Sequence, residues 1–383
     1  MARSSGPSHA TLALKLIIDN SLLLIVGAVT ALVWANVSPA TYEDGTHGVV
    51  HFLVNDVGMV FFFALATKEV VEAMLPGGAL SSPRKASVPI FAAVGGMAAP
   101  AALFLTLIAV IGRPDLHSGW AIPCATDIAF SYLVARVVFP NGHPAIPFLL
   151  LLAIADDALG LILLAIFYPT GVVSLTQLVG WLGPAVLLAW ALRKTGVESF
   201  WFYVIGPGVL AWCGLFLGGL HPALALVPIV PFMPHHASEL KLFSGRATQL
   251  RTMHHFERWW KLPVQLVLFA FGLVNAGVPL ASIGPVTWII AAALIVGKPV
   301  GIVGTTAIAG ALGFPRAAGL DLRAMIALGI TAGIGFTVAL FFTTASFPPG
   351  VVLEQAKMGA LLSFLAAPIA ILAGRLLRIG TVR

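Results

Sequence analysis

Long apolar runs separated by short polar segments extend along nearly the whole chain of 383 residues. A transmembrane helix needs about 20 mostly apolar residues, and by this measure the sequence contains twelve candidate spans. They lie at about residues 12–35, 50–72, 86–111, 118–138, 145–168, 174–192, 199–213, 214–233, 260–278, 286–310, 322–346 and 352–376. The runs are continuous rather than alternating, which argues against a β-barrel. The pattern therefore predicts an all-α integral membrane protein.

A single membrane domain is expected to occupy residues 1–383, with tails at 1–11 and 377–383. The longest polar interval, about 235–261, is too short to form a soluble domain. No convincing small-residue cleavage site follows the first apolar run, so this run is assigned to the first span rather than to a signal peptide. The boundary between the seventh and eighth spans is the least defined, because glycines and a proline interrupt both.

Composition and charge agree with a membrane location. Hydrophobic residues make up 59% of the chain and charged residues only 9%, against about 25% charged residues in soluble domains. With the N-terminus inside, all but three of the 21 Lys and Arg residues fall on the cytoplasmic side, as the positive-inside rule requires. The exceptions are Arg113, Lys357 and Lys298. Both termini are thus predicted to be cytoplasmic, and the net charge of +6 reflects topology rather than nucleic-acid binding. The two cysteines are expected to be buried free thiols.

Three carboxylates interrupt apolar segments that otherwise exclude charge: Asp127, Asp156 and Asp157. The segment 140–144 is rich in turn residues and predicts a loop between two antiparallel helices. Asp127 and Asp156 are almost equally far from this loop, so they lie at a similar depth on adjacent helices. Ionisable groups inside a membrane are costly and are functional by default.

The adjacent residues Asp156 and Asp157 diverge by about 100° on a helix, so each can have a different task. One can coordinate a cation while the other pairs with Lys298, which lies in the tenth span. Nearby like charges and burial both favour the protonated carboxyl group, so the pair is expected to alternate between charged and neutral forms. Lys298 is either a counter-ion that holds the bundle together or a titrating member of the site.

Two spans contain predicted helix breaks, one at Thr126-Asp127 and one at 331–337 with Gly333 and Gly335. Non-helical backbone inside a membrane is tolerated where it is buried in protein or lines a cavity, and paired breaks are typical of transporter sites. Asp127 would balance the positive helix N-termini at these breaks, and Lys298 the negative C-termini. Close helix packing is an alternative explanation for the two glycines.

Several motifs together resemble the NhaA type of bacterial sodium/proton antiporter, a family with established inverted repeats. The resemblance covers about residues 12–378. Its most specific parts are Val54-Asn-Asp-Val-Gly58, Ala93-Val-Gly-Gly-Met97, Ala125-Thr-Asp-Ile-Ala-Phe130, Ala155-Asp-Asp-Ala-Leu-Gly160, Leu220-His-Pro-Ala223, Asn275-Ala-Gly277, Gly297-Lys-Pro299 and Gly333-Ile-Gly-Phe-Thr337.

The resemblance implies an electrogenic, pH-regulated exchanger of Na⁺ or Li⁺ for H⁺ in the bacterial inner membrane, with no cofactor and no enzymatic activity. Asp156 and Asp157 would bind the cation and protons, and Thr126, Asp127 and Lys298 would provide charge compensation and proton coupling, with Lys298 the partner of Asp156. The positions that match the pH-responsive region are Glu69, Glu72, His221 and Asp56. The run Lys68-Glu-Val-Val-Glu72 departs from the family pattern, so the pH dependence is expected to differ.

Some alternatives remain open from the sequence. His221 could equally be a hydrogen-bonded core histidine, and the segment 41–50 could form a hairpin at a homodimer contact or an ordinary loop. A symporter for an organic anion is a second transport hypothesis, but it would require an arginine inside a span. An intramembrane aspartyl protease is a third hypothesis, although its Gly-x-Gly-Asp pattern is missing. Ion preference, proton stoichiometry and flux direction do not follow from the sequence.

Overall fold

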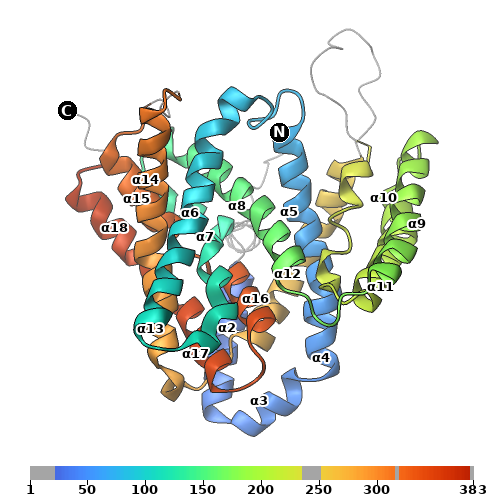
Figure 1. Ribbon diagram of the computed structural model, residues 1–383, viewed down its shortest axis with the longest axis horizontal. Coiled ribbons are helices and arrows are strands. Elements are labelled where there is room, and N and C mark those ends of the chain that lie inside the picture. Colours follow the sequence, from blue (N-terminus) through green and yellow to red (C-terminus); the bar gives the residue numbers. More distant parts are fainter. Residues whose placement is uncertain (1–21, 235–251, 315–318, 380–383) are drawn as a thin grey trace, which may run out of the picture.

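The computed structural model describes residues 22–234, 252–314 and 319–379, and within them the chain forms only helices and turns (Figure 1). This confirms the prediction of an all-α protein. The start of the first predicted span and most of the polar interval 235–261 lie outside the described residues. So do seven of the basic residues used to predict orientation: Arg3, Lys15, Lys241, Arg246, Arg251, Arg316 and Arg383.

The helices follow the apolar runs. They are α2 (Leu22–Val37), α3 (Pro39–Thr46), α4 (Val49–Phe52), α5 (Met59–Met74), α6 (Pro83–Val110), α7 (Ile128–Val138), α8 (Ala145–Phe167), α9 (Leu175–Lys194), α10 (Phe200–Tyr203), α11 (Val209–Leu217), α12 (Thr252–Asn275), α13 (Pro285–Ala292), α14 (Lys298–Ala311), α15 (Leu322–Ala332), α16 (Phe336–Ser346), α17 (Val351–Leu362) and α18 (Ala366–Leu376). The π-helical turns η1 (Leu53–Gly58), η3 (Val204–Gly208) and η7 (Ala293–Gly297) join α4 to α5, α10 to α11 and α13 to α14.

Within the described residues, seven helical segments are long and apolar enough to cross a membrane. Two further pairs of helices pass the same test together but are bent at a short break. The 3₁₀-helix η2 (Pro114–Cys124) and α7 meet at 57°, and α15 and α16 meet at 49°. The bends fall at the two segments where the sequence predicts helix breaks.

The eighth predicted span is not a regular helix. After α11 ends, residues 218–234 form turns and the short 3₁₀-helices η4 (Pro222–Leu224) and η5 (Val230–Phe232). Gly219 has a φ of +77°, which terminates the helix, and the four prolines that follow up to residue 234 lack a backbone N–H. Much of this segment is buried, so its apolar composition reflects burial rather than helix formation.

This irregular segment nevertheless runs the length of α9. At one end of α9, the Ser174 N–H donates to the Gly218 carbonyl (3.1 Å). At the other end, the Arg193 guanidinium donates to the Pro231 carbonyl (2.8 Å). The helices α9, α10 and α11 form a group at one side of the molecule (Figure 1).

The segment 41–50 is neither a hairpin nor an ordinary loop. Residues 39–46 form α3, with Pro39 at the first helical position, where its missing N–H is harmless. The short helix α4 follows directly and leads through η1 into α5. In Figure 1, α3 lies at one end of the helical bundle.

Glycines allow a close helix contact between α6 and α14. A Cβ atom at Gly301 of α14 would collide with the Gly95 carbonyl of α6 and would lie 2.7 Å from the Ala99 Cβ. At the start of α14, a Cβ at Gly297 would lie 2.7 Å from the Pro100 Cα. The backbones of α6 and α14 therefore approach more closely than side chains would permit, and Lys298 is held in this contact.

We expect Gly301→Ala to destabilise the protein because the added methyl group has no space, with a loss of about 1–3 kcal/mol typical of overpacking. Gly304→Ala is the matched control on the same helix, since nothing lies within 4 Å of its Cβ position. The control should be neutral or slightly stabilising. Thermal unfolding in detergent would measure both, and equal melting temperatures for the two variants would contradict the packing argument.

Candidate ion-binding site

The two helix breaks contact each other directly, although they are about 200 residues apart in sequence. The Asp127 N–H donates to the Ile334 carbonyl at 2.7 Å. The Thr126 hydroxyl oxygen lies 3.1 Å from the Ala332 carbonyl oxygen. Each break therefore satisfies polar backbone groups of the other, which is necessary where no helical partner is present.

Asp127 lies at the N-termini of two helices. It is the N-cap of α7, where its Oδ1 accepts the Phe130 N–H at 3.2 Å. Its Oδ2 accepts the N–H of Thr337 at 3.2 Å and also the Thr337 hydroxyl, near the start of α16. Only 5% of Asp127 is exposed. The carboxylate thus meets two positive helix ends, where the sequence analysis expected it.

Lys298 is fully buried. Its ammonium lies at the C-terminal end of η2, where the helix dipole is negative. Its Nζ is 2.9 Å from the Asp156 Oδ2 and donates to the carbonyl of Cys124, the last residue of η2. The Thr126 hydroxyl donates to the same Asp156 Oδ2 at 2.6 Å. The Asp156 Oδ1 is buried and accepts no hydrogen bond, so one oxygen of this carboxylate remains open to a ligand.

Gly333 and Gly335 are required by close approach rather than by backbone conformation. Their φ angles are −67° and −109°, which any residue can adopt. A Cβ at Gly333 would lie 2.7 Å from the Leu294 carbonyl in η7, and a Cβ at Gly335 would lie 2.7 Å from the Ala125 carbonyl. The packing explanation therefore accounts for both glycines, and the contacts they permit bring η7 and the break before α7 against the second break.

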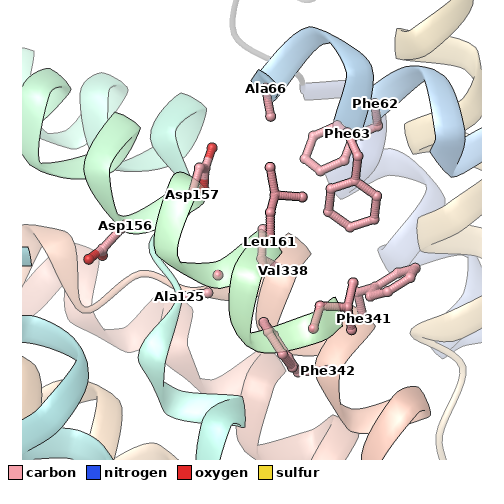
Figure 2. Close-up of a pocket in the computed structure, with 12 residues that line it drawn as sticks. Phe62, Phe63, Ala66, Ala125, Asp156, Asp157, Leu161, Val338, Phe341 and Phe342 are labelled. Carbon is pink, nitrogen blue, oxygen red and sulfur yellow. The ribbon is translucent and has the colours of Figure 1, made fainter. Parts of the chain in front are cut away.

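Asp157 lines two cavities. The larger, of about 320 Å³, also contains Glu69, Thr126, Asp127 and Thr337 on its wall. The smaller cavity, of about 10 Å³, is large enough for about one water molecule and is lined by both Asp156 and Asp157. Figure 2 shows the two carboxylates pointing in different directions from α8, as expected for adjacent helical residues.

Aromatic side chains close the smaller cavity on the side away from the aspartates. Phe62 and Phe63 come from α5, and Phe341 and Phe342 come from α16 (Figure 2). The ring centroids of Phe63 and Phe341 are 5.0 Å apart in an edge-to-face arrangement. Phe341 and Phe342 are almost completely buried. The structure therefore has an open cavity on one side of Asp157 and a closed aromatic layer on the other.

At the wall of the larger cavity, Lys68 forms two ion pairs. Its Nζ is 2.7 Å from Glu72 and 2.6 Å from Glu257 of α12. Lys68 itself is only 4% exposed. In the sequence this run and the segment His254-His-Phe-Glu-Arg258 both depart from the family pattern, but no role in the site was predicted for Glu257, Gln265 or Lys261, which also line the cavity. The available signal was the mixture of polar and apolar residues in the first half of α12.

His221 and Asp56 lie apart from the aspartate pair. The His221 Nδ1 accepts the Ala223 N–H at 3.3 Å, and the side chain is buried. Its ring lies 4.7 Å from the Phe341 ring, centroid to centroid. The Asp56 Oδ1 is 3.9 Å from the His221 Nδ1. The two cysteines are free thiols as predicted, but only Cys124 is buried, whereas Cys213 is half-buried.

Apolar helices around a buried, charged centre define an integral membrane protein of the transporter class. The family model described as Na⁺/H⁺ antiporter 1 matches residues 13–375, so the chain belongs to this family. This confirms the resemblance to NhaA-type antiporters found in the motifs.

Two relatives and one solved structure illustrate the similarity. A protein of Geobacter metallireducens named Na(+)/H(+) antiporter NhaA is 45% identical over 374 residues, which cover 96% of this chain and 98% of the relative. A protein of the same name from Desulfitobacterium hafniense is 44% identical over 373 residues, 95% of each chain. The structure of the sodium proton antiporter MjNhaP1 from Methanocaldococcus jannaschii is similar with a TM-score of 0.51 at 15% identity, covering 96% of this chain and 94% of that one. The last comparison shows a shared fold.

We expect Lys298→Met to destabilise the protein by about 3–5 kcal/mol, because it leaves the Asp156 carboxylate buried without its partner. The double variant Lys298→Met/Asp156→Asn removes both charges and should recover most of this loss. A double-mutant cycle in thermal stability, measured in detergent with both single variants, tests the pair. A double variant no more stable than Lys298→Met would show that Lys298 does not stabilise the protein through Asp156.

Proposed function

We propose that the protein exchanges Na⁺ or Li⁺ for H⁺, with cation and protons competing for Asp156 and Asp157. The observation that carries the proposal is the position of Asp157 on the walls of both the open and the closed cavity. Hard carboxylate and carbonyl oxygens suit a hard cation. The name Na(+)/H(+) antiporter carried by relatives at about 45% identity supports the same substrates.

Competition follows from the bonds that each carboxylate already makes. A cation that enters the larger cavity reaches Asp157, and the smaller cavity is lined by Asp157 together with Asp156, whose Oδ1 has no hydrogen-bond partner. A bound cation takes the place of the Lys298 ammonium as the positive charge beside Asp156. Protonation of the carboxylates removes the negative charge that holds the cation. The site has two carboxylates for each cation, and a stoichiometry above one proton per cation would make exchange electrogenic.

Alternating access is proposed to involve the two bent helix pairs as the broken fourth and eleventh spans of a twelve-span, inverted-repeat fold. The mutual bonds of the two breaks support this assignment, because movement of one break must carry the other. The segment 218–234 would supply the eighth crossing in irregular form. Both termini would lie in the cytoplasm of a bacterial cell, and the larger cavity would open there, since Lys68 and Lys261 line it.

An organic-anion symporter has less support. That function would require a cationic side chain to bind a carboxylate or phosphate, and Arg is the usual choice. No arginine is among the described residues that line either cavity. The lysine nearest the aspartates, Lys298, is already bonded to Asp156 and to a backbone carbonyl.

Na⁺- or Li⁺-induced proton release in everted membrane vesicles tests the proposed function. We expect wild type to respond and Asp157→Asn to lose the response, because the carboxylate shared by both cavities is neutralised. Asp115→Asn is the matched control: this acid is exposed, paired with Arg113 at 2.6 Å, and should leave exchange unchanged. Silence of the wild type from acidic to alkaline pH would rule out the proposal.

We propose that the ion pairs of Lys68 set the pH response. Burial raises the pKa of Glu257, but the Lys68 ammonium, with a smaller contribution from His254, more than offsets burial and holds this pKa below its usual range. Glu257 precedes the apolar stretch of α12 that begins near residue 260. Lys68→Met removes the opposing charge, so Glu257 would release its proton at a higher pH.

Activation of exchange in Lys68→Met should therefore begin at a more alkaline pH than in wild type, as measured by proton release across a pH series. Lys194→Met removes the same charge from the end of α9, where Lys194 stacks on Trp190, and should leave the profile unchanged. An unchanged or more acidic midpoint for Lys68→Met would argue against this role.

A further inference from the structure

Tyr168 connects the end of α8 to η2, the first half of a bent helix pair. It follows α8 directly and is only 4% exposed. Its hydroxyl donates to the Ser118 carbonyl at 2.7 Å and accepts the Ala121 N–H at 3.2 Å. Because α8 also carries Asp156 and Asp157, the helix that bears the aspartate pair is bonded at its end to η2.

The two backbone groups that bind this hydroxyl belong to one turn of η2. In a 3₁₀-helix each N–H donates to the carbonyl three residues earlier, so the hydroxyl is bonded to the acceptor and the donor of the same turn, Ser118 and Ala121. At 11 residues η2 is much longer than the usual run of about three or four residues, because the hydrogen bonds of this helix type are poorly aligned. Pro123 weakens η2 further, since it has no N–H to donate to the Trp120 carbonyl. η2 therefore depends on contacts from outside, and the Tyr168 hydroxyl provides two of them.

The end of η2 binds the ammonium of Lys298. Cys124, its last residue, accepts a hydrogen bond from the Lys298 Nζ through its carbonyl. This carbonyl follows Ala121 by one 3₁₀ turn, about 6 Å along the helix axis. The Cys124 thiol sulfur also lies 3.4 Å from the Met97 carbonyl oxygen of α6. The position of the turn that Tyr168 binds therefore sets the position of the carbonyl that Lys298 binds.

The same junction contacts the aromatic layer. The Tyr168 and Phe342 rings meet edge to face with centroids 5.3 Å apart, and Phe342 lines the smaller cavity (Figure 2). The backbone of η2 packs closely here, since a Cβ at Gly119 would lie 2.6 Å from the Phe347 Cζ at the end of α16. Tyr168 thus contacts η2 and α16 from the end of α8, and movement of η2 relative to α8 must break its hydrogen bonds.

We propose that Tyr168 is a positioning residue for cation binding, whose hydroxyl holds η2 where the Cys124 carbonyl receives the Lys298 ammonium. This inference rests on the proposed function and extends it. In that function a cation takes the place of Lys298 beside Asp156, so a contact that stabilises Lys298 in its present position makes cation binding less favourable. Tyr168 would thus set the apparent affinity for the cation without touching it.

Proton release from everted vesicles, titrated with Na⁺ at a fixed pH, tests the inference. Tyr168→Phe keeps the ring and removes the hydroxyl, so the Lys298 ammonium is held less firmly. The apparent KM for Na⁺ should fall about three-fold, as for the loss of one hydrogen bond of ordinary strength.

Tyr203→Phe is the matched control. Tyr203 is a buried tyrosine of α10 whose hydroxyl donates to the Val197 carbonyl at 3.3 Å, and its loss should leave the KM unchanged. An unchanged or higher KM for Tyr168→Phe, whatever its kcat, would indicate a merely structural role and would overturn the inference.

A double-mutant cycle in thermal unfolding gives a second readout that does not require transport. In the background Lys298→Met/Asp156→Asn, the Cys124 carbonyl has already lost its ammonium. Tyr168→Phe should lower the melting temperature by less in this background than in wild type, because the two contacts act on the same turns of η2 and are not additive. Tyr203→Phe should lower it equally in both backgrounds. Equal losses for Tyr168→Phe would overturn the inference.

The two hypotheses fail differently. Absence of exchange in the wild type at every pH removes the proposed function, whereas the coupling between Tyr168 and Lys298 would still be seen in unfolding. Normal exchange in the wild type, together with an unchanged KM and an additive cycle for Tyr168→Phe, removes only the role of Tyr168.

Discussion

The ion pair between Lys298 and Asp156 is the interaction on which the rest of the structure depends. A lysine with no exposed surface is tolerated only because its ammonium pairs with a carboxylate and donates a hydrogen bond to a backbone carbonyl. That carbonyl is available because η2 ends at Cys124, and the next residues stay non-helical because the second break supplies their hydrogen bonds. The two bends, the glycine contacts and the buried charges are thus one arrangement, and removing any member leaves unsatisfied polar groups in an apolar interior.

Much of this arrangement follows from local sequence rules. Charged residues in apolar runs identified Asp127, Asp156, Asp157 and Lys298, and the loop at 140–144 correctly placed α7 against α8. The contacts that complete the site could not be predicted in this way. The partners of Asp127 and Lys298 include backbone groups, the Cys124 carbonyl and the Thr337 N–H, and every residue type carries such groups. Their position depends on how distant segments pack.

The errors in the sequence analysis have a similar physical origin. Hydropathy reports whether a segment is buried, and residues 218–234 are apolar because they pack against other helices, not because they form one. Likewise, the short polar segment before α5 gave no signal of α3. Glu257 was missed because its importance comes from Lys68, a residue 189 positions away whose ammonium it shares with Glu72.

The π turn η7 ends at Gly297, and Lys298 follows it directly. A π turn contains about one residue more per turn than an α-helix, so it sets the direction of every side chain that follows. If the same residues formed a regular α-helix, Lys298 would be turned by about 100° away from Asp156. The charged residues of the site could all be present in that case while their bond is lost. For proteins of this family, the helical form of this segment is therefore as informative about the site as the identity of its residues.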